Sequence, residues 1–133
     1  MLYKLSGGND MISLSDGEWK LMNLLWDESP LTIGRMVEAL RGDTNWSKAT
    51  VNIMLGRLAE KGAVSVDASG RAKLYTPLLG REEAVRQEAR ECLGRIRTGG
   101  VGLLVSAMAE DCGLSEEEIE ELYRILRKGK TNG

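Results

Sequence analysis

Residues 47–61 combine side chains that can make contacts with DNA. If the segment is a helix turning ~100° per residue, Val51, Met54, Leu55 and Leu58 fall on one side, which must face a core. The opposite side and its flanks carry small, hydroxyl, amide and guanidinium groups, which can reach base edges and phosphates in a major groove. The candidate DNA contacts in this segment are Ser47, Lys48, Ala49, Thr50, Asn52, Ile53 and Arg57.

Ile53 is the most informative of these residues, because an apolar side chain that faces away from the core can pack against a thymine methyl group. The alternative is a plain surface helix with one harmless exposed apolar residue. The local charge favours DNA, since six basic residues stand against three acidic ones between Arg41 and Tyr75, whereas the whole chain has a net charge of -2. Arg71 and Lys73, in a hairpin after the helix, complete the candidate surface, although they could also simply keep the hairpin soluble.

The composition excludes several other kinds of chemistry. The 133 residues include no histidine, which rules out Ser-His-Asp and Cys-His catalysis and imidazole metal ligands. Cys92 and Cys112 lack the close spacing of a metal site or redox pair, and no glycine-rich phosphate loop is present. We therefore predict no enzyme activity, no cofactor and no metal.

The elements that must position the candidate residues follow a recognisable order. Ser15 and Glu18 form a capping-box pattern that opens a helix, and the segment before Pro30 ends it. A second helix is predicted to begin after Thr32, and the third runs from Ser47 to Lys61. Two short runs of alternating apolar and polar residues, 64–66 and 72–75, predict a β-hairpin. Three helices followed by a hairpin are typical of a winged helix-turn-helix.

The rest of the chain predicts three short amphipathic helices, 81–96, 101–109 and 115–128. Helices of this length have little core of their own and most often bury their apolar faces against a partner. For the last helix, an ordinary core within one chain is the alternative. The predicted dimer-interface residues are Val85, Ala89, Leu93, Val101, Leu104, Val105, Met108, Ile119, Leu122, Ile125 and Leu126.

The predicted fold is mainly α with a small β-hairpin: an N-terminal winged helix-turn-helix and a C-terminal three-helix dimerisation region. We assign residues 1–13 to a disordered leader, 14–79 to the DNA-binding domain, 80–128 to the dimerisation domain and 129–133 to a disordered tail. No apolar stretch has the length of a signal peptide core or a membrane span, so we expect a cytoplasmic protein without membrane insertion.

The sequence also resembles the penicillinase repressor family, in four segments. Residues 14–19 and 24–26 resemble its opening helix, 46–51 and 54–64 its recognition-helix segment, 70–71 and 74–77 its wing and 114–126 its last dimerisation helix. The resemblance implies a homodimeric transcriptional repressor that binds a palindromic operator in double-stranded DNA. The DNA contacts of the family carry over onto Ser47, Thr50, Arg57 and Arg71, and less directly onto Ala49 and Ile53, where relatives tend to have Lys and Thr.

The resemblance also bears on regulation. The copper-responsive branch ends in a Cys-x-Cys motif that residues 128–133 lack, so copper or zinc sensing is not expected. The β-lactam-responsive branch is inactivated by cleavage of an Asn-Phe bond in the short middle helix of the dimerisation half. The matching position is Ala107-Met108, which is either a cleavage site for a membrane-bound sensor protease or a pair of packing residues.

The sequence is also compatible with two rival functions. One is a winged-helix regulator that senses a small ligand, although aromatic residues make up only 5% of the chain and the helices are too short to suggest a pocket. The other is a protein-protein interaction module, which would show no salt-dependent binding to nucleic acid.

Overall fold

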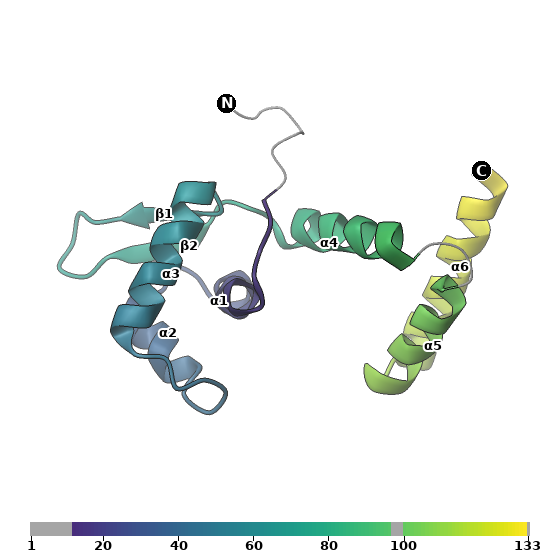
Figure 1. Cartoon of the computed structure of the whole chain (residues 1–133), viewed down its shortest axis with the longest axis horizontal. Coiled ribbons are helices and arrows are strands. Elements are labelled where there is room, and N and C mark those ends of the chain that lie inside the picture. The colour runs from purple at the N-terminus through teal and green to yellow at the C-terminus, as the bar shows by residue number, and fades with distance from the viewer. Residues whose placement is uncertain (1–11, 97–99, 133) are drawn as a thin grey trace. The chain divides into compact units, whose positions relative to one another are not determined.

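The computed structural model of the chain describes residues 12–96 and 100–132, which fall into two compact units divided between Glu88 and Ala89. The order of elements confirms the predicted fold class, mainly α with one small hairpin. The elements are α1 (Asp16–Asp27), α2 (Ile33–Ala39), α3 (Lys48–Lys61), β1 (Val64–Asp67), β2 (Leu74–Pro77), α4 (Arg81–Ile96), α5 (Val101–Asp111) and α6 (Glu116–Asn132) (Figure 1).

The first helix begins with the predicted capping box. The Ser15 hydroxyl accepts a hydrogen bond from the Glu18 N–H at 3.2 Å, and the Glu18 carboxylate accepts one from the Ser15 N–H at 2.9 Å. Glu18 is buried and also pairs with the Lys61 ammonium group at 2.6 Å, a contact that the sequence pattern did not predict. Burial by itself raises the pKa of Glu18, but the hydrogen bonds from Lys61 and Ser15 and the positive charge of Lys61 outweigh it, so the pKa lies below its ordinary value of 4.5. The start of α1 is thereby tied to the end of α3.

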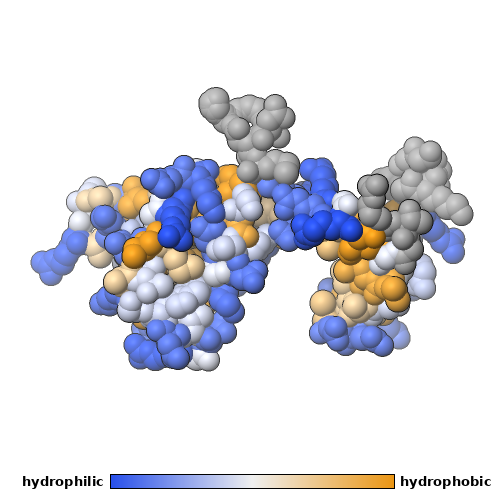
Figure 2. All heavy atoms as spheres, viewed as in Figure 1, coloured by the Kyte–Doolittle hydropathy of each residue, from blue (hydrophilic) through white to orange (hydrophobic). Residues whose placement is uncertain are grey.

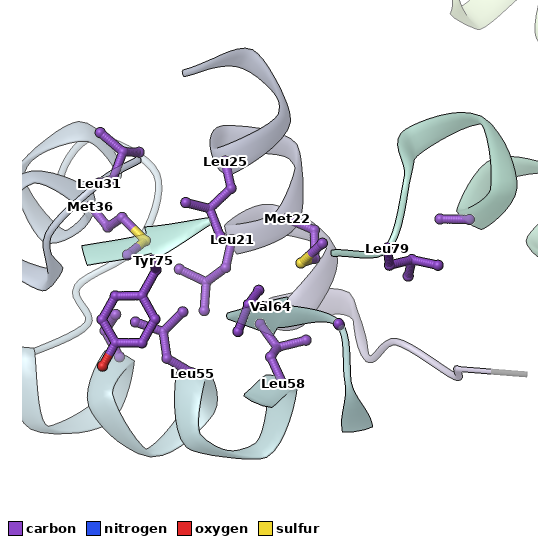
Figure 3. Close-up of a cluster of buried hydrophobic side chains, with 13 residues drawn as sticks. Leu21, Met22, Leu25, Leu31, Met36, Leu55, Leu58, Val64, Tyr75 and Leu79 are labelled. Atoms are coloured by element: carbon purple, nitrogen blue, oxygen red, sulfur yellow. The ribbon is translucent and has the colours of Figure 1, made fainter. Parts of the chain in front are cut away.

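One hydrophobic core holds the three helices and the hairpin together. In Figure 3, Leu55 and Leu58 point from α3 toward Leu21 of α1 and Val64 of β1. Gly17 of α1 lies close against Met54 and Trp46, because a Cβ atom there would lie only 2.6 Å from the Met54 methyl carbon and 3.2 Å from the Trp46 ring. The buried core residues are Leu21, Met22, Leu25, Leu31, Met36, Val51, Leu55, Leu58, Ala63, Val64, Tyr75, Leu79 and Ala84.

The hairpin is antiparallel, with a register that runs from Val64 opposite Pro77 to Asp67 opposite Leu74. The second strand therefore begins two residues later than the predicted run 72–75, because the pairing ends at Asp67 and residues 68–73 form the loop. Leu31, just before α2, exchanges two backbone hydrogen bonds with Tyr75, at 3.1 and 2.9 Å. This bridge, which the sequence did not predict, fixes the hairpin beside the helix-turn-helix.

The first half of α4 belongs to the winged-helix unit, whereas the sequence placed the boundary at residue 80. Ala84 is buried in the core, the Trp26 indole N–H donates to the Leu79 carbonyl at 2.8 Å, and Arg81 pairs with Asp27 at 2.5 Å. The other end of the unit also extends further than predicted. Ile12 packs against the core and its carbonyl accepts a hydrogen bond from Gln87 at 3.1 Å; residues 1–11 of the predicted leader lie outside the described part.

The second unit contains the end of α4 followed by α5 and α6. The predicted capping box at the start of α6 is confirmed by the reciprocal hydrogen bonds between Ser115 and Glu118, at 3.0 and 3.1 Å. The helix continues to Asn132, through most of the segment predicted as a tail. None of the residues whose burial is described in this unit is fully buried. None of the described helices is long and apolar enough to cross a membrane.

Candidate nucleic-acid interface

The third helix presents the candidate residues on its outer side. Val51, Leu55 and Leu58 are fully buried, whereas the side chain of Ile53 is 57% exposed. The arc assigned to the core from the sequence is therefore the buried one, although Met54 is only partly covered. The seven candidates in the segment are all exposed: Ser47, Lys48, Ala49, Thr50, Asn52, Ile53 and Arg57.

The start of α3 is held by its own hydroxyl groups. The Ser47 hydroxyl accepts a hydrogen bond from the Thr50 N–H at 3.2 Å and lies 3.2 Å from the Thr50 hydroxyl. Ser47 is therefore the N-cap of the helix, whatever else it contacts. Thr32 caps α2 in the same way, by accepting from the Arg35 N–H at 3.2 Å. These two N-caps set the first residues of α2 and α3.

An open hollow of about 580 Å³ lies between the start of α2, the first half of α3 and the loop of the hairpin. Among the described residues that line it, the charged ones are Lys48 and Lys73, one from the helix and one from the wing. A concave surface with two ammonium groups favours an anionic partner, and its open shape suits an extended one such as a nucleic-acid backbone. The lining residues are Thr32, Ile33, Gly34, Lys48, Ala49, Asn52, Ala72 and Lys73.

The basic candidates are not involved in ion pairs with other described residues. Among residues 12–96 and 100–132, Lys48, Arg57, Arg71 and Lys73 form no ion pair. Lys61, counted in the local positive charge of the sequence, differs, because it is paired with Glu18. Lys48 is the first residue of α3, where the helix dipole disfavours a cation by ~0.3–1 kcal/mol. Its position therefore works slightly against helix stability.

The wing projects from the rest of its unit, as the hairpin in Figure 1 shows. Its loop is shaped by Asp67, whose carboxylate accepts hydrogen bonds from the Ser69 hydroxyl at 2.7 Å and the Ser69 N–H at 3.0 Å. These two bonds lower the pKa of Asp67. Arg71 and Lys73 follow in the same loop and are both exposed. The wing thus extends two basic side chains into solvent.

The predicted interface residues leave much apolar surface uncovered in the single chain. Figure 2 shows hydrophobic side chains gathered on the C-terminal unit, where α5 carries Val101 at 42% and Met108 at 38% exposure. Val85, Ala89, Leu93 and Ile125 are also exposed, Leu104, Val105, Ile119 and Leu122 are half-buried, and the side chain of Leu126 lies outside the described part.

Two further residues of this apolar surface were missed from the sequence, Leu103 at 75% and Tyr123 at 63% exposure. Leu103 lies off the stripe used for the prediction, yet the segment Val101-Gly102-Leu103-Leu104-Val105 is apolar all round. A helix with that composition is normally covered on every side, which was the available signal.

The predicted cleavage position lies in the interior of α5. Ala107 and Met108 are both exposed and stand between the helix ends at Val101 and Asp111. The two cysteines are free, with Cys92 half-buried and Cys112 exposed. Within the described ranges, no group of three or more Cys, Asp or Glu residues is arranged to hold a metal ion.

Comparison with known proteins identifies the family. Residues 14–128 match the penicillinase repressor family model. The chain is 32% identical to the penicillinase repressor of Bacillus licheniformis over 117 residues, 88% of this chain and 91% of the relative. It is 27% identical to the methicillin resistance regulatory protein MecI of Staphylococcus aureus over 120 residues, 90% of this chain and 98% of the relative.

Among solved structures, the solution structure of the DNA binding domain of the repressor BlaI aligns with a TM-score of 0.49 and 30% identity, covering 54% of this chain and 88% of that one. The family match confirms the resemblance seen in the sequence. It also confirms that the chain is no enzyme, because the family consists of transcriptional repressors. The chain belongs to the penicillinase repressor family.

Proposed function

We propose that this protein represses transcription as a homodimer bound to a palindromic operator, and that it acts in the cytoplasm. The observation that carries the proposal is the surface formed by α3 and the wing. Four basic side chains there lack ion pairs with described residues, and two of them flank an open hollow. The membership of a repressor family supports the same conclusion.

In the proposed complex α3 lies in the major groove, and the wing contacts the neighbouring phosphates. Lys48 of α3 and Lys73 of the wing, which both line the hollow, bind the DNA backbone. Thr50, Asn52 and Arg57 are exposed on the two flanks of α3, where a hydroxyl, an amide and a guanidinium group can bond base edges. Phosphate contacts then supply most of the affinity, and the α3 side chains supply the sequence preference.

The second copy is proposed to cover the apolar surface of the C-terminal unit. A unit without a fully buried described residue has too little core to be stable alone, and a second copy offers the matching apolar surface. Linking two DNA-binding units makes binding to the second half-site intramolecular, which raises the affinity for a palindrome far above that of one unit. Weakening the dimer therefore releases the operator without any change in α3.

Release by proteolysis at Ala107-Met108 is the proposed route of induction, with a membrane-bound sensor protease as the partner. The bond lies inside α5, and a protease binds its substrate as an extended chain. Local unfolding of α5 must therefore precede cleavage, which suits a helix with no fully buried residue. The cut would separate α6 from the DNA-binding unit and so remove part of the proposed interface.

The test is selection of bound sequences from random DNA by the full-length protein, at two salt concentrations. We expect one palindromic sequence to be enriched, with an affinity that falls steeply as salt rises. Arg57→Ala should weaken binding to that sequence by ~1–3 kcal/mol and leave the dimer intact in sedimentation. Absence of nucleic-acid binding at both salt concentrations would refute the proposal and favour a protein-protein interaction module.

A further inference from the structure

Ile53 points almost directly away from the core of its unit. The buried residues Val51, Leu55 and Leu58 lie ~140–200° around the helix from it. Its side chain is 57% exposed, so most of an isoleucine faces solvent in the middle of α3. A β-branched residue is a weaker helix former than alanine or lysine, and an exposed position gains little from packing. Neither helix formation nor the core therefore accounts for isoleucine at this position.

The neighbours of Ile53 on the helix surface leave it accessible. Ala49 and Gly56, one turn away on either side, are exposed and too small to cover it. A Cβ atom at Gly56 would meet nothing within 4 Å, so the space beside Ile53 is open down to the helix backbone. These three residues form an apolar strip, with the polar side chains of Asn52 and Arg57 on its two flanks.

We infer that Ile53 determines part of the operator sequence by packing against the 5-methyl group of a thymine in each half-site. This inference rests on the proposed function, because it places the exposed side of α3 in a major groove. Thymine is the only standard base with a methyl group in that groove, so an apolar side chain there selects it. The absence of bulky neighbours at Ala49 and Gly56 lets the base edge approach closely enough for contact.

The test uses the palindrome selected by the full-length protein from random DNA. Each thymine is replaced in turn by deoxyuridine, which removes the methyl group and keeps the base pair. At one position in each half-site we expect about fourfold weaker binding, because the complex no longer buries that methyl group. The same replacement should have no effect on Ile53→Ala, which itself binds the thymine sequence more weakly. Leu78→Ala is the matched control, since Leu78 is also exposed but lies after β2, and this variant should keep the deoxyuridine effect.

Loss of the deoxyuridine effect in Ile53→Ala alone would support the inference. A selected palindrome at which every deoxyuridine replacement is neutral, or affects both proteins equally, would overturn it and leave the proposed function intact. Failure to select any sequence would overturn both. Because Ile53 is exposed, circular dichroism of Ile53→Ala should show an unchanged fold, which separates lost contact from lost structure.

Discussion

Replacement of Lys48 and Lys73 by glutamine tests whether the hollow between α3 and the wing binds phosphates. Both side chains are exposed and neither forms an ion pair with a described residue, so the fold should not depend on them. Removing Lys48 should even stabilise α3 slightly, because a cation at the first helical position opposes the helix dipole. The double variant therefore changes the charge of the surface and little else.

The expected magnitude follows from the number of unpaired cations. With Lys48, Arg71 and Lys73 each on one phosphate, a dimer makes about six phosphate contacts, and log K should fall with log salt at a slope of about -5.4. The double variant removes about four of these contacts, which reduces the slope to about -1.8. Near ~0.1 M salt its affinity should be lower by more than a thousandfold, and the two proteins should converge near ~1 M.

The assay is fluorescence anisotropy of the selected operator, titrated at several salt concentrations. Arg86→Gln provides the control, because Arg86 is an exposed cation of α4 that pairs with Glu82 at 3.1 Å, and its loss should leave the slope unchanged. An unchanged slope in the double variant would refute the assignment of the hollow to the DNA backbone. Equal slopes for the double variant and the control would do the same.

Three further perturbations test other parts of the structure. Gly56→Ala should stabilise the protein by ~0.5–1 kcal/mol in urea denaturation, because the added Cβ atom has no neighbour within 4 Å. The same variant should weaken operator binding, and an unchanged affinity would exclude close approach of DNA to α3. Lys61→Met should cost ~1–2 kcal/mol of unfolding free energy at neutral pH. Because the pKa of Glu18 is lowered from 4.5 on folding, this difference should shrink as the pH falls through the lowered value; a constant difference would contradict the ion pair. Leu122→Glu should give monomers in sedimentation that bind DNA weakly, whereas a stable dimer would remove Leu122 from the interface.

The sequence by itself determined the local structure of this protein and the family to which it belongs. Ser15, Thr32, Ser47 and Ser115 each begin a helix as predicted, because an N-cap acts through hydrogen bonds within three residues. The apolar spacing of α3 identified its buried side, since helical periodicity fixes which residues share a face. The exposure of the candidate DNA contacts on α3 followed from the same periodicity, and the family from motifs along the chain.

Only the tertiary structure decided which basic side chains form ion pairs and where the wing lies. The pairing of Lys61 with Glu18 joins residues 43 positions apart, so no local pattern separated Lys61 from the unpaired Lys48. The bridge between Leu31 and Tyr75 and the meeting of Lys48 with Lys73 around one hollow are likewise contacts between distant segments. Periodicity and capping act over a few residues, whereas these contacts form only when the core brings separate elements together.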